Sequence, residues 1–221
     1  MFVLLAFMLG WLFGMAINFF HGKDQMTETL STAAEEGKKQ IAITFDDGPN
    51  PEYTMKLLEG LKKRGVKATF FVLGEEVERY PDILKAAYDD GHLIGVHSYQ
   101  HVNFGQIGDA AALEQVEKTR QAIYDVTGEY TGYIRPPYGC WKKELDQELP
   151  MIEVLWDIDP LDWATKDADT VVQRVLQKCP DGSIILLHDA SESSVCAAFT
   201  IIDTLQKQGY EFVTVEELML E

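Results

Sequence analysis

Two adjacent carboxylates lie in the stretch Thr44-Phe45-Asp46-Asp47-Gly48-Pro49, directly after the short apolar run Ile41-Ala42-Ile43. The apolar run predicts a buried strand, and the glycine and proline end it in a turn because they cannot continue the ladder. Neighbouring side chains on an extended backbone point to opposite sides. We therefore expect Asp46 and Asp47 to do different work, one as a metal ligand and the other as a proton carrier. The alternative is a solvated turn in which one aspartate caps the next helix.

The composition is that of a folded, acidic protein. Of the 221 residues, 46% are hydrophobic and 11% are aromatic, which is enough to build a sizeable core. The formal net charge of -17 argues against nucleic acid as a partner, because a phosphate-binding surface needs clustered Lys and Arg. The three cysteines, Cys140, Cys179 and Cys196, form no close-spaced pair, so neither a zinc ribbon nor a disulfide framework is indicated.

The amino-terminal segment predicts a membrane anchor. Residues 2–20 carry no charge and only one strongly polar side chain, Asn18, and as a helix they would be about 30 Å long. A cleaved signal peptide would need a basic start and a nearby cleavage site, and a buried core helix would usually show a polar face. We interpret residues 1–20 as a single transmembrane helix, residues 21–39 as a polar stalk and residues 40–221 as one catalytic domain.

From residue 40 onward, short apolar runs alternate with amphipathic segments. Strands are predicted at 41–45, 68–73, 93–97, 132–135, 152–157, 183–188 and 211–215. Helices are predicted from an N-cap at Asn50 to a stop at Gly65, from about Asp109 to Gly128, and between the sixth and seventh strands before Gly209. This alternation indicates parallel strands with right-handed crossovers, in either a doubly wound sheet or a closed, irregular barrel.

Ionisable residues recur where the predicted strands end. His97 and His101 follow the third strand, Arg135 the fourth, Asp162 the fifth and His188 the sixth. If the chain turns helically after the third strand, its two histidines share a face and can hold one metal ion. Taken singly, each residue has an ordinary explanation as a surface cation, a helix cap or a buried histidine. Five such clusters at the carboxyl ends of parallel strands converge best in a barrel, so we predict an enzyme.

Five ordered motifs resemble those of the polysaccharide deacetylase family, carbohydrate esterase family 4. They are Thr44-Phe45-Asp46-Asp47-Gly48-Pro49, His97-Ser98-x-x-His101, Arg135-Pro136-Pro137-Tyr138, Asp162-Trp163 and Leu186-x-His188. The resemblance covers about residues 38–219. It implies an α/β fold, a distorted (β/α) barrel with about seven parallel strands, here preceded by the transmembrane helix. It also implies removal of N-acetyl groups from N-acetylglucosamine polymers such as peptidoglycan or chitooligosaccharides.

The resemblance assigns roles to the residues around the two carboxylates. It implies that Asp47, His97 and His101 hold a divalent metal ion, zinc or another ion such as cobalt. Asp46 would be the general base that takes a proton from the attacking water, and Arg135 would orient it.

The same resemblance assigns the remaining motif residues to the leaving group and the substrate. His188 would be the general acid that protonates the departing amine, with Asp162 favouring its charged form. The backbone N–H of Tyr138, together with the metal ion, would stabilise the oxyanion. Trp163 and Leu186 would line the pocket for the acetyl methyl group.

Two other functions stay open at this stage. The same machinery could act on O-acetyl esters of a polysaccharide such as xylan, or the domain could be a catalytically silent glycan-binding module. In each case the partner is an acetylated glycan. We expect a single-pass protein of the cell membrane with its domain outside, where such glycans occur, against a flanking charge pattern (Lys23 followed by Asp24) that leans the other way.

Overall fold

The computed structural model describes residues 39–220. The predicted anchor and nearly all of the predicted stalk lie outside the described residues, so both stay predictions. Between Lys39 and Leu220, no helix combines the length and the apolar character needed to cross a membrane.

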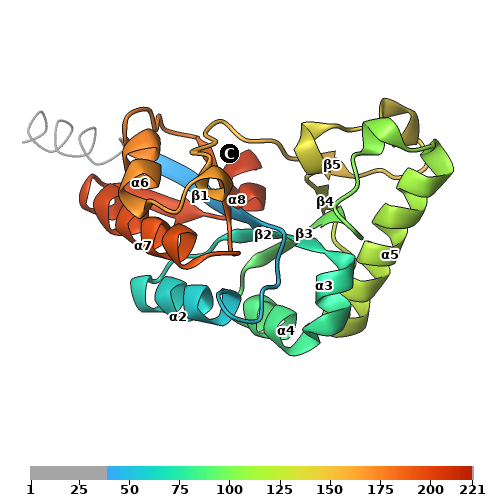
Figure 1. Cartoon of the computed structure of the whole chain (residues 1–221), viewed down its shortest axis with the longest axis horizontal. Helices are drawn as coiled ribbons and strands as arrows, with labels where there is room; N and C mark the ends of the chain where they lie inside the picture. The colour runs from blue at the N-terminus through green and yellow to red at the C-terminus, as the bar shows by residue number, and fades with distance from the viewer. Residues whose placement is uncertain (1–38, 221) are drawn as a thin grey trace, which may run out of the picture. The chain divides into compact units, whose positions relative to one another are not determined.

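Parallel strands form the centre of the fold (Figure 1). They are β1 (Lys39–Asp46), β2 (Thr69–Leu73), β3 (Leu93–Ser98), β4 (Tyr133–Ile134), β5 (Ile152–Glu153), β6 (Ile184–His188) and β7 (Tyr210–Val213). The order in the sheet is β5-β4-β3-β2-β1-β6, and β7 pairs with the first half of β1. All of these pairings are parallel, as the alternating sequence pattern predicted.

The sheet curls, and the segment after β5 links its two ends. β5 pairs with β4, whereas Ile158, five residues further on, bridges to Ile185 of β6. The amides of Asp157 and Ile158 donate to the carbonyl of Ile184, at 2.9 and 3.2 Å. The fold is therefore a curled (β/α) half-barrel whose strand ends face a common centre.

Helices surround the sheet, and most of them cover the outer face of the curl. They are α2 (Thr54–Arg64), α3 (Gly74–Arg79), α4 (Pro81–Asp89), α5 (Asp109–Thr127), α6 (Ala168–Leu176), α7 (Glu192–Lys207) and α8 (Val215–Met219). Helix α8 packs through Val215 against Ala42 and Phe71 on the inner side of the curl. Successive helices contact one another around the sheet: α6 with α7, α7 with α2, α2 with α4, and α4 with α5.

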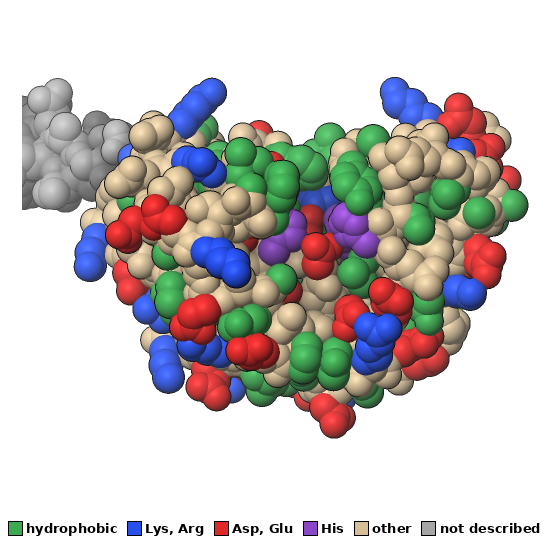
Figure 2. All heavy atoms as spheres, in the orientation of Figure 1, with side chains coloured by type: hydrophobic (Ala, Val, Ile, Leu, Met, Phe, Trp, Pro, Cys, Tyr) green, Lys and Arg blue, Asp and Glu red, His purple; other side chains and the backbone are tan. Residues whose placement is uncertain are grey.

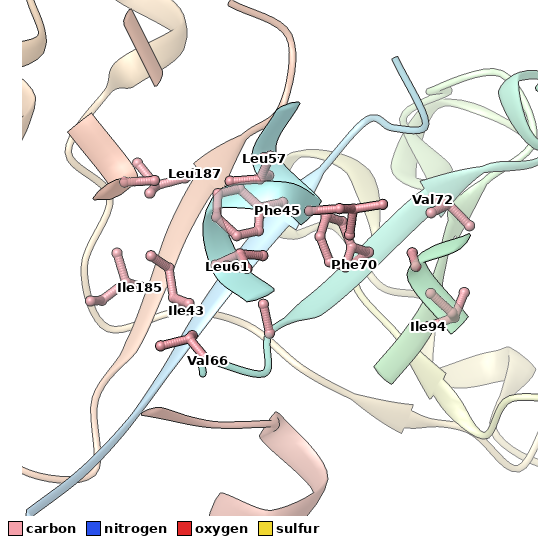
Figure 3. Close-up of a cluster of buried hydrophobic side chains, with 14 of the residues drawn as sticks. Ile43, Phe45, Leu57, Leu61, Val66, Phe70, Val72, Ile94, Ile185 and Leu187 are labelled. Atoms are coloured by element: carbon pink, nitrogen blue, oxygen red, sulfur yellow. The ribbon is translucent and has the colours of Figure 1, made fainter. Parts of the chain in front are cut away.

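Alternate residues of β1 face two different environments, as the period of a strand requires. Ile43 and Phe45 pack outward against α2, where they meet Leu57 and Leu61 (Figure 3). Each such side chain, when fully buried, stabilises the fold by about 1.5–3 kcal/mol. Thr44 and Asp46 face inward instead, so the same strand that builds the core also delivers polar groups to the interior of the curl.

Two predicted boundaries are wrong for identifiable reasons. The helix expected from Asn50 begins at Thr54, because the Asn50 side chain accepts the amides of Glu52 and Tyr53 and holds a turn ahead of the helix. The strand expected over 152–157 is paired with β4 only at Ile152–Glu153. In contrast, α5 ends where expected, at Gly128, whose φ of 78° suits glycine.

Candidate active site

The two carboxylates of the first motif surround one histidine. Asp46 is the last residue of β1 and is 3% exposed, whereas Asp47 has a left-handed φ of 75° and is half-buried. The backbone turn brings Asp47 Oδ1 within 3.4 Å of His97 Nε2, while Asp46 Oδ2 lies 3.9 Å from Nδ1 of the same ring. Our expectation that the pair points to opposite sides of an extended strand is therefore wrong, because Asp47 is not extended.

His97 is held as a neutral imidazole. Its Nδ1 lies 2.7 Å from the carbonyl oxygen of Arg135, which can only accept, so Nδ1 carries the proton and Nε2 keeps a lone pair. Burial lowers the pKa of His97 to about 3. A backbone carbonyl on the far nitrogen is a common way of orienting a metal-binding histidine.

His101 reaches the same place through a bend. β3 ends at Ser98, and His101 has a φ of 54° in a segment without helical structure, so the predicted helical turn is absent. Its Nε2 nevertheless lies 3.4 Å from Asp47 Oδ1, and the centroids of the His97 and His101 rings are 5.1 Å apart. A left-handed backbone conformation at Asp47 and at His101 brings their side chains together. The helical turn that the spacing of His97 and His101 suggested is not needed.

The cluster of Asp47, His97 and His101 fits a divalent cation. One ligand atom from each residue lies within 4.8 Å of the other two. Asp47 Oδ1 is buried and has no hydrogen-bond partner among the described residues, a costly state for a carboxylate oxygen. A carboxylate oxygen and two imidazole nitrogens are a usual donor set for zinc with an open coordination position.

Arg135 holds Asp46 from the other side. The guanidinium is fully buried and donates to Asp46 Oδ1 at 2.8 Å and to Thr44 Oγ1 at 2.6 Å. It also donates to the carbonyls of Val154 and Leu155, at 3.0 and 2.9 Å. Burial raises the pKa of Asp46 above its ordinary value, and the charge of Arg135 opposes this rise. The result is a buried carboxylate with one oxygen tied to arginine and the other facing His97.

Asp162 and His188 form a second pair of ionisable groups, in which the histidine is the basic partner. Asp162 Oδ1 lies 2.8 Å from His188 Nδ1, and its Oδ2 accepts the backbone N–H of His188 at 2.9 Å. Burial lowers the pKa of His188, but the hydrogen bond and charge of Asp162 outweigh it and raise the pKa to about 9. The ring is therefore cationic near neutrality. His188 is also the register partner of Asp46 across β1 and β6, so the two ionisable groups stand on neighbouring strands.

An open cavity of about 210 Å³ lies beside Asp47 and the Asp162–His188 pair. Figure 2 shows histidine side chains facing one another across a hollow, with acidic groups between them and a basic group deeper. The cavity is lined by Asp47, Asp162, Trp163, Thr165, Lys166, His188, Ala190, Ser191 and Ser194.

The three residues expected to contact substrate differ in their placement. Trp163 lines the cavity and is 66% exposed. Tyr138 is 63% exposed, with a φ of 59°, and its ring stands edge-on to His101 at 4.9 Å between centroids. Leu186 is 4% exposed within β6 and is not among the residues that line this cavity. Tyr138 and Trp163 are thus exposed at the surface around the site, whereas Leu186 is buried.

Two supporting residues were missed by the sequence analysis. Thr44, two residues before Asp46 and so on the same face of β1, shares the guanidinium of Arg135. Asp189 is 1% exposed, accepts the hydroxyl of Thr54 and leaves Oδ1 unpaired, and burial raises its pKa to about 7. A Cβ at Gly48 would collide with this carboxylate, so Asp189 packs under the carboxylate turn. The strand period could have identified Thr44, but the position of Asp189 depends on tertiary packing.

The geometry defines a class of protein before any comparison is made. A water molecule beside Asp47, His97 and His101 would meet a proton acceptor on one side, Asp46, and a proton donor on the other, His188. That is the chemistry of a metal-assisted hydrolase. The chain belongs to the polysaccharide deacetylase family, because residues 33–153 match the family described by that name.

Named relatives agree with this assignment. The chain is 39% identical over 180 residues to the peptidoglycan-N-acetylglucosamine deacetylase PgdA of Listeria monocytogenes, covering 81% of this chain and 39% of the relative. It is 41% identical over 195 residues to the peptidoglycan-N-acetylmuramic acid deacetylase PdaC of Bacillus subtilis, covering 86% of this chain and 42% of the relative. The chain therefore spans about two-fifths of the length of these two relatives.

A solved structure of peptidoglycan deacetylase PdaC from Bacillus subtilis has the same fold. It superposes with a TM-score of 0.81 at 42% sequence identity, over 83% of this chain and 91% of that chain.

Replacing Asp162 with Asn is expected to lower the pKa of His188 from about 9 toward the ordinary value of about 6.5, because the neutral amide no longer favours the imidazolium. Because the folded pKa lies above the unfolded one, the wild-type pair stabilises the fold fully below about pH 6.5. That contribution is lost as the pH rises through about 9. NMR titration of labelled histidine measures the pKa. Asp82→Asn, an exposed change on α4, is the control, and an unchanged His188 pKa in Asp162→Asn would contradict the pairing.

Proposed function

We propose that the chain is a metal-dependent N-deacetylase that removes acetyl groups from N-acetylglucosamine units of peptidoglycan or chitooligosaccharides. The observation that carries the proposal is that the Asp47–His97–His101 cluster, Arg135-held Asp46 and Asp162-held His188 come together where the central strands end. The names of the relatives point to peptidoglycan, but they differ in the sugar, N-acetylglucosamine in one and N-acetylmuramic acid in the other.

Asp46 is the proposed general base and His188 the proposed general acid. A divalent cation bound by the cluster would supply a Lewis acid that polarises the acetyl carbonyl. Asp46 accepts a proton from the attacking water, whose oxygen forms the new bond to the carbonyl carbon. The C–N bond breaks, and His188 gives its Nε2 proton to the departing amine, so that acetate and a 2-amino sugar leave. The neighbours of Asp46 and of His188 set their pKa values in different ways, so one can act as base and the other as acid near neutral pH.

Zinc is the proposed metal ion. Two imidazole nitrogens and one carboxylate oxygen suit zinc, and cobalt accepts the same donors. His97 already directs its lone pair to the cluster, because its other nitrogen donates to the Arg135 carbonyl. The exposed rings of Trp163 and Tyr138 flank the open side and would contact the sugar. The proposed contact of Leu186 with the acetyl methyl group stays a prediction.

Acetate release from defined glycans tests the proposal. We expect release from N-acetylchitotetraose and from peptidoglycan fragments, loss of release after chelation, and recovery on adding zinc or cobalt. Release confined to acetylated xylan would instead make the chain an O-acetyl esterase. No release from any of these glycans by a folded, metal-loaded protein would favour the silent glycan-binding module.

The division of labour between the two carboxylates is testable with a pair of variants. Asp46→Asn is expected to keep the metal and to lower turnover about 10²- to 10⁴-fold, the usual contribution of a general base. Asp47→Ala is expected to weaken metal binding, with partial recovery of turnover at high metal concentration. Metal analysis and acetate release are measured on both variants, with Asp82→Asn as the control. Loss of the metal in Asp46→Asn but not in Asp47→Ala would reverse the two roles.

We also propose that the domain is anchored by residues 1–20 and faces the outside of the cell, where peptidoglycan lies. The support is the uncharged run in the sequence and the class of substrate. Protease added to intact cells is then expected to release the domain, while a cytoplasmic marker protein stays intact. Full protection of the domain, with digestion only after lysis, would contradict this orientation.

A further inference from the structure

Two adjoining cavities lie near the amino ends of the strands, at the opposite end of the sheet from Asp46 and His188. β3 and β4 pair through Val96 and Ile134, and residues at the amino ends of both strands, Leu93, Ile94 and Tyr133, line the first cavity. This first cavity has a volume of about 210 Å³, and the adjoining one of about 520 Å³ continues toward α8. The two share Tyr88, His92, Leu93 and Glu216 among their lining residues.

Tyrosine rings supply much of the wall. Tyr88, Tyr130 and Tyr133 line the first cavity, together with the apolar side chains of Ile94 and Ile123. Tyr130 is 54% exposed although it stacks on Tyr124, with 4.4 Å between ring centroids. The electron-rich face of such a ring attracts the weakly positive C–H groups on the flat side of a pyranose.

Acidic side chains line the cavities beside these rings, while the nearest guanidinium, that of Arg120, lies over the Tyr130 ring at 5.3 Å from its centroid. Glu216 accepts the hydroxyl of Tyr133 at 3.0 Å, and a hydrogen bond to Glu129 helps to raise the pKa of Tyr88. No lysine or arginine is among the residues that line either cavity. Within residues 39–220, neither Glu129 nor Glu216 forms a salt bridge. Each carboxylate therefore has capacity left for a cation.

His92 contributes a buried hydrogen-bond donor. It is 4% exposed, and its Nδ1 accepts the N–H of Ala68 at 3.1 Å, so the proton of the neutral ring is on Nε2. Burial lowers the pKa of His92 to about 4, which keeps the ring neutral. Its Nε2–H has no acceptor among the described residues, and the ring lines both cavities. A hydroxyl group entering the cavity could accept this hydrogen bond.

We propose that this cavity binds the deacetylated glycan, through the ammonium group of a 2-amino sugar. The ammonium would pair with Glu129 and Glu216, the pyranose would stack on the tyrosines, and a hydroxyl would accept from His92. The identity of the sugar rests on the proposed function, because deacetylation converts a neutral acetamide into this cation. If the protein binds the product of its own reaction at the end of the sheet opposite the active site, it would stay attached to glycan that has already been deacetylated.

Calorimetry on the full chain in detergent tests the proposal with two tetrasaccharides. β-1,4-linked glucosamine tetramer and cellotetraose differ only in carrying an ammonium or a hydroxyl group at each C2. We expect the amino sugar to bind at least about tenfold more tightly, the range of a charge-assisted hydrogen bond. The double variant Glu129→Gln/Glu216→Gln is expected to remove this preference. Glu59→Gln, an exposed change on α2, controls for the loss of negative charge and is expected to keep it.

Two further measurements keep the outcomes separate. Tyr130→Ala, at an exposed position, is expected to weaken both tetramers while keeping the preference for the amino sugar, and thermal unfolding checks that each variant folds. Equal affinity for the two tetramers, or an unchanged preference in the double variant, would overturn the proposal. Wild-type acetate release decides the proposed function independently. An inactive chain with selective binding leaves the site standing, and an active chain without it refutes this inference alone.

Discussion

The buried pair of Arg135 and Asp46 is the contact on which the rest of the site depends. The guanidinium is fully buried, and its donors reach Thr44, Asp46 and two carbonyls of the segment after β5. Its own carbonyl oxygen orients His97. Removing one partner of such a pair leaves an uncompensated buried charge, which typically costs about 3–5 kcal/mol. Strand β1, the closing segment and the ring of His97 are therefore positioned by a single residue.

The site places opposite charges in two different ways. The carboxyl group of Asp46 lies beside the guanidinium of Arg135, deep in the curl, where burial raises its pKa and the charge of Arg135 opposes the rise. His188 is a cation hydrogen-bonded to the buried carboxyl group of Asp162, which helps to raise the pKa of His188 to about 9. The half-buried Asp47 lines the open cavity together with His188. Because both ionised states are supported by fixed neighbours, little reorganisation is needed when charge moves during a reaction.

The sequence predicted the parallel strands and the clustering of polar groups at their carboxyl ends, because strand periodicity is local and the ends of parallel strands converge. It did not predict how Asp47 and His101 reach the same point, since the left-handed φ values of 75° and 54° are tertiary solutions with no signature in spacing. The start of α2 was misplaced because Asn50 caps a turn rather than the helix. Asp189 escaped notice because a carboxylate reads as exposed until packing is known.

The register of β1 against β6 has a consequence for how this family can change its substrates. Asp46 and His188 are direct cross-strand partners, so their backbones are about 4.8 Å apart, as neighbouring strands always are. That separation is maintained by ladder hydrogen bonds rather than by any loop. The exposed loops that carry Tyr138 and Trp163 can therefore be lengthened, shortened or exchanged, while the spacing of Asp46 and His188 stays constant.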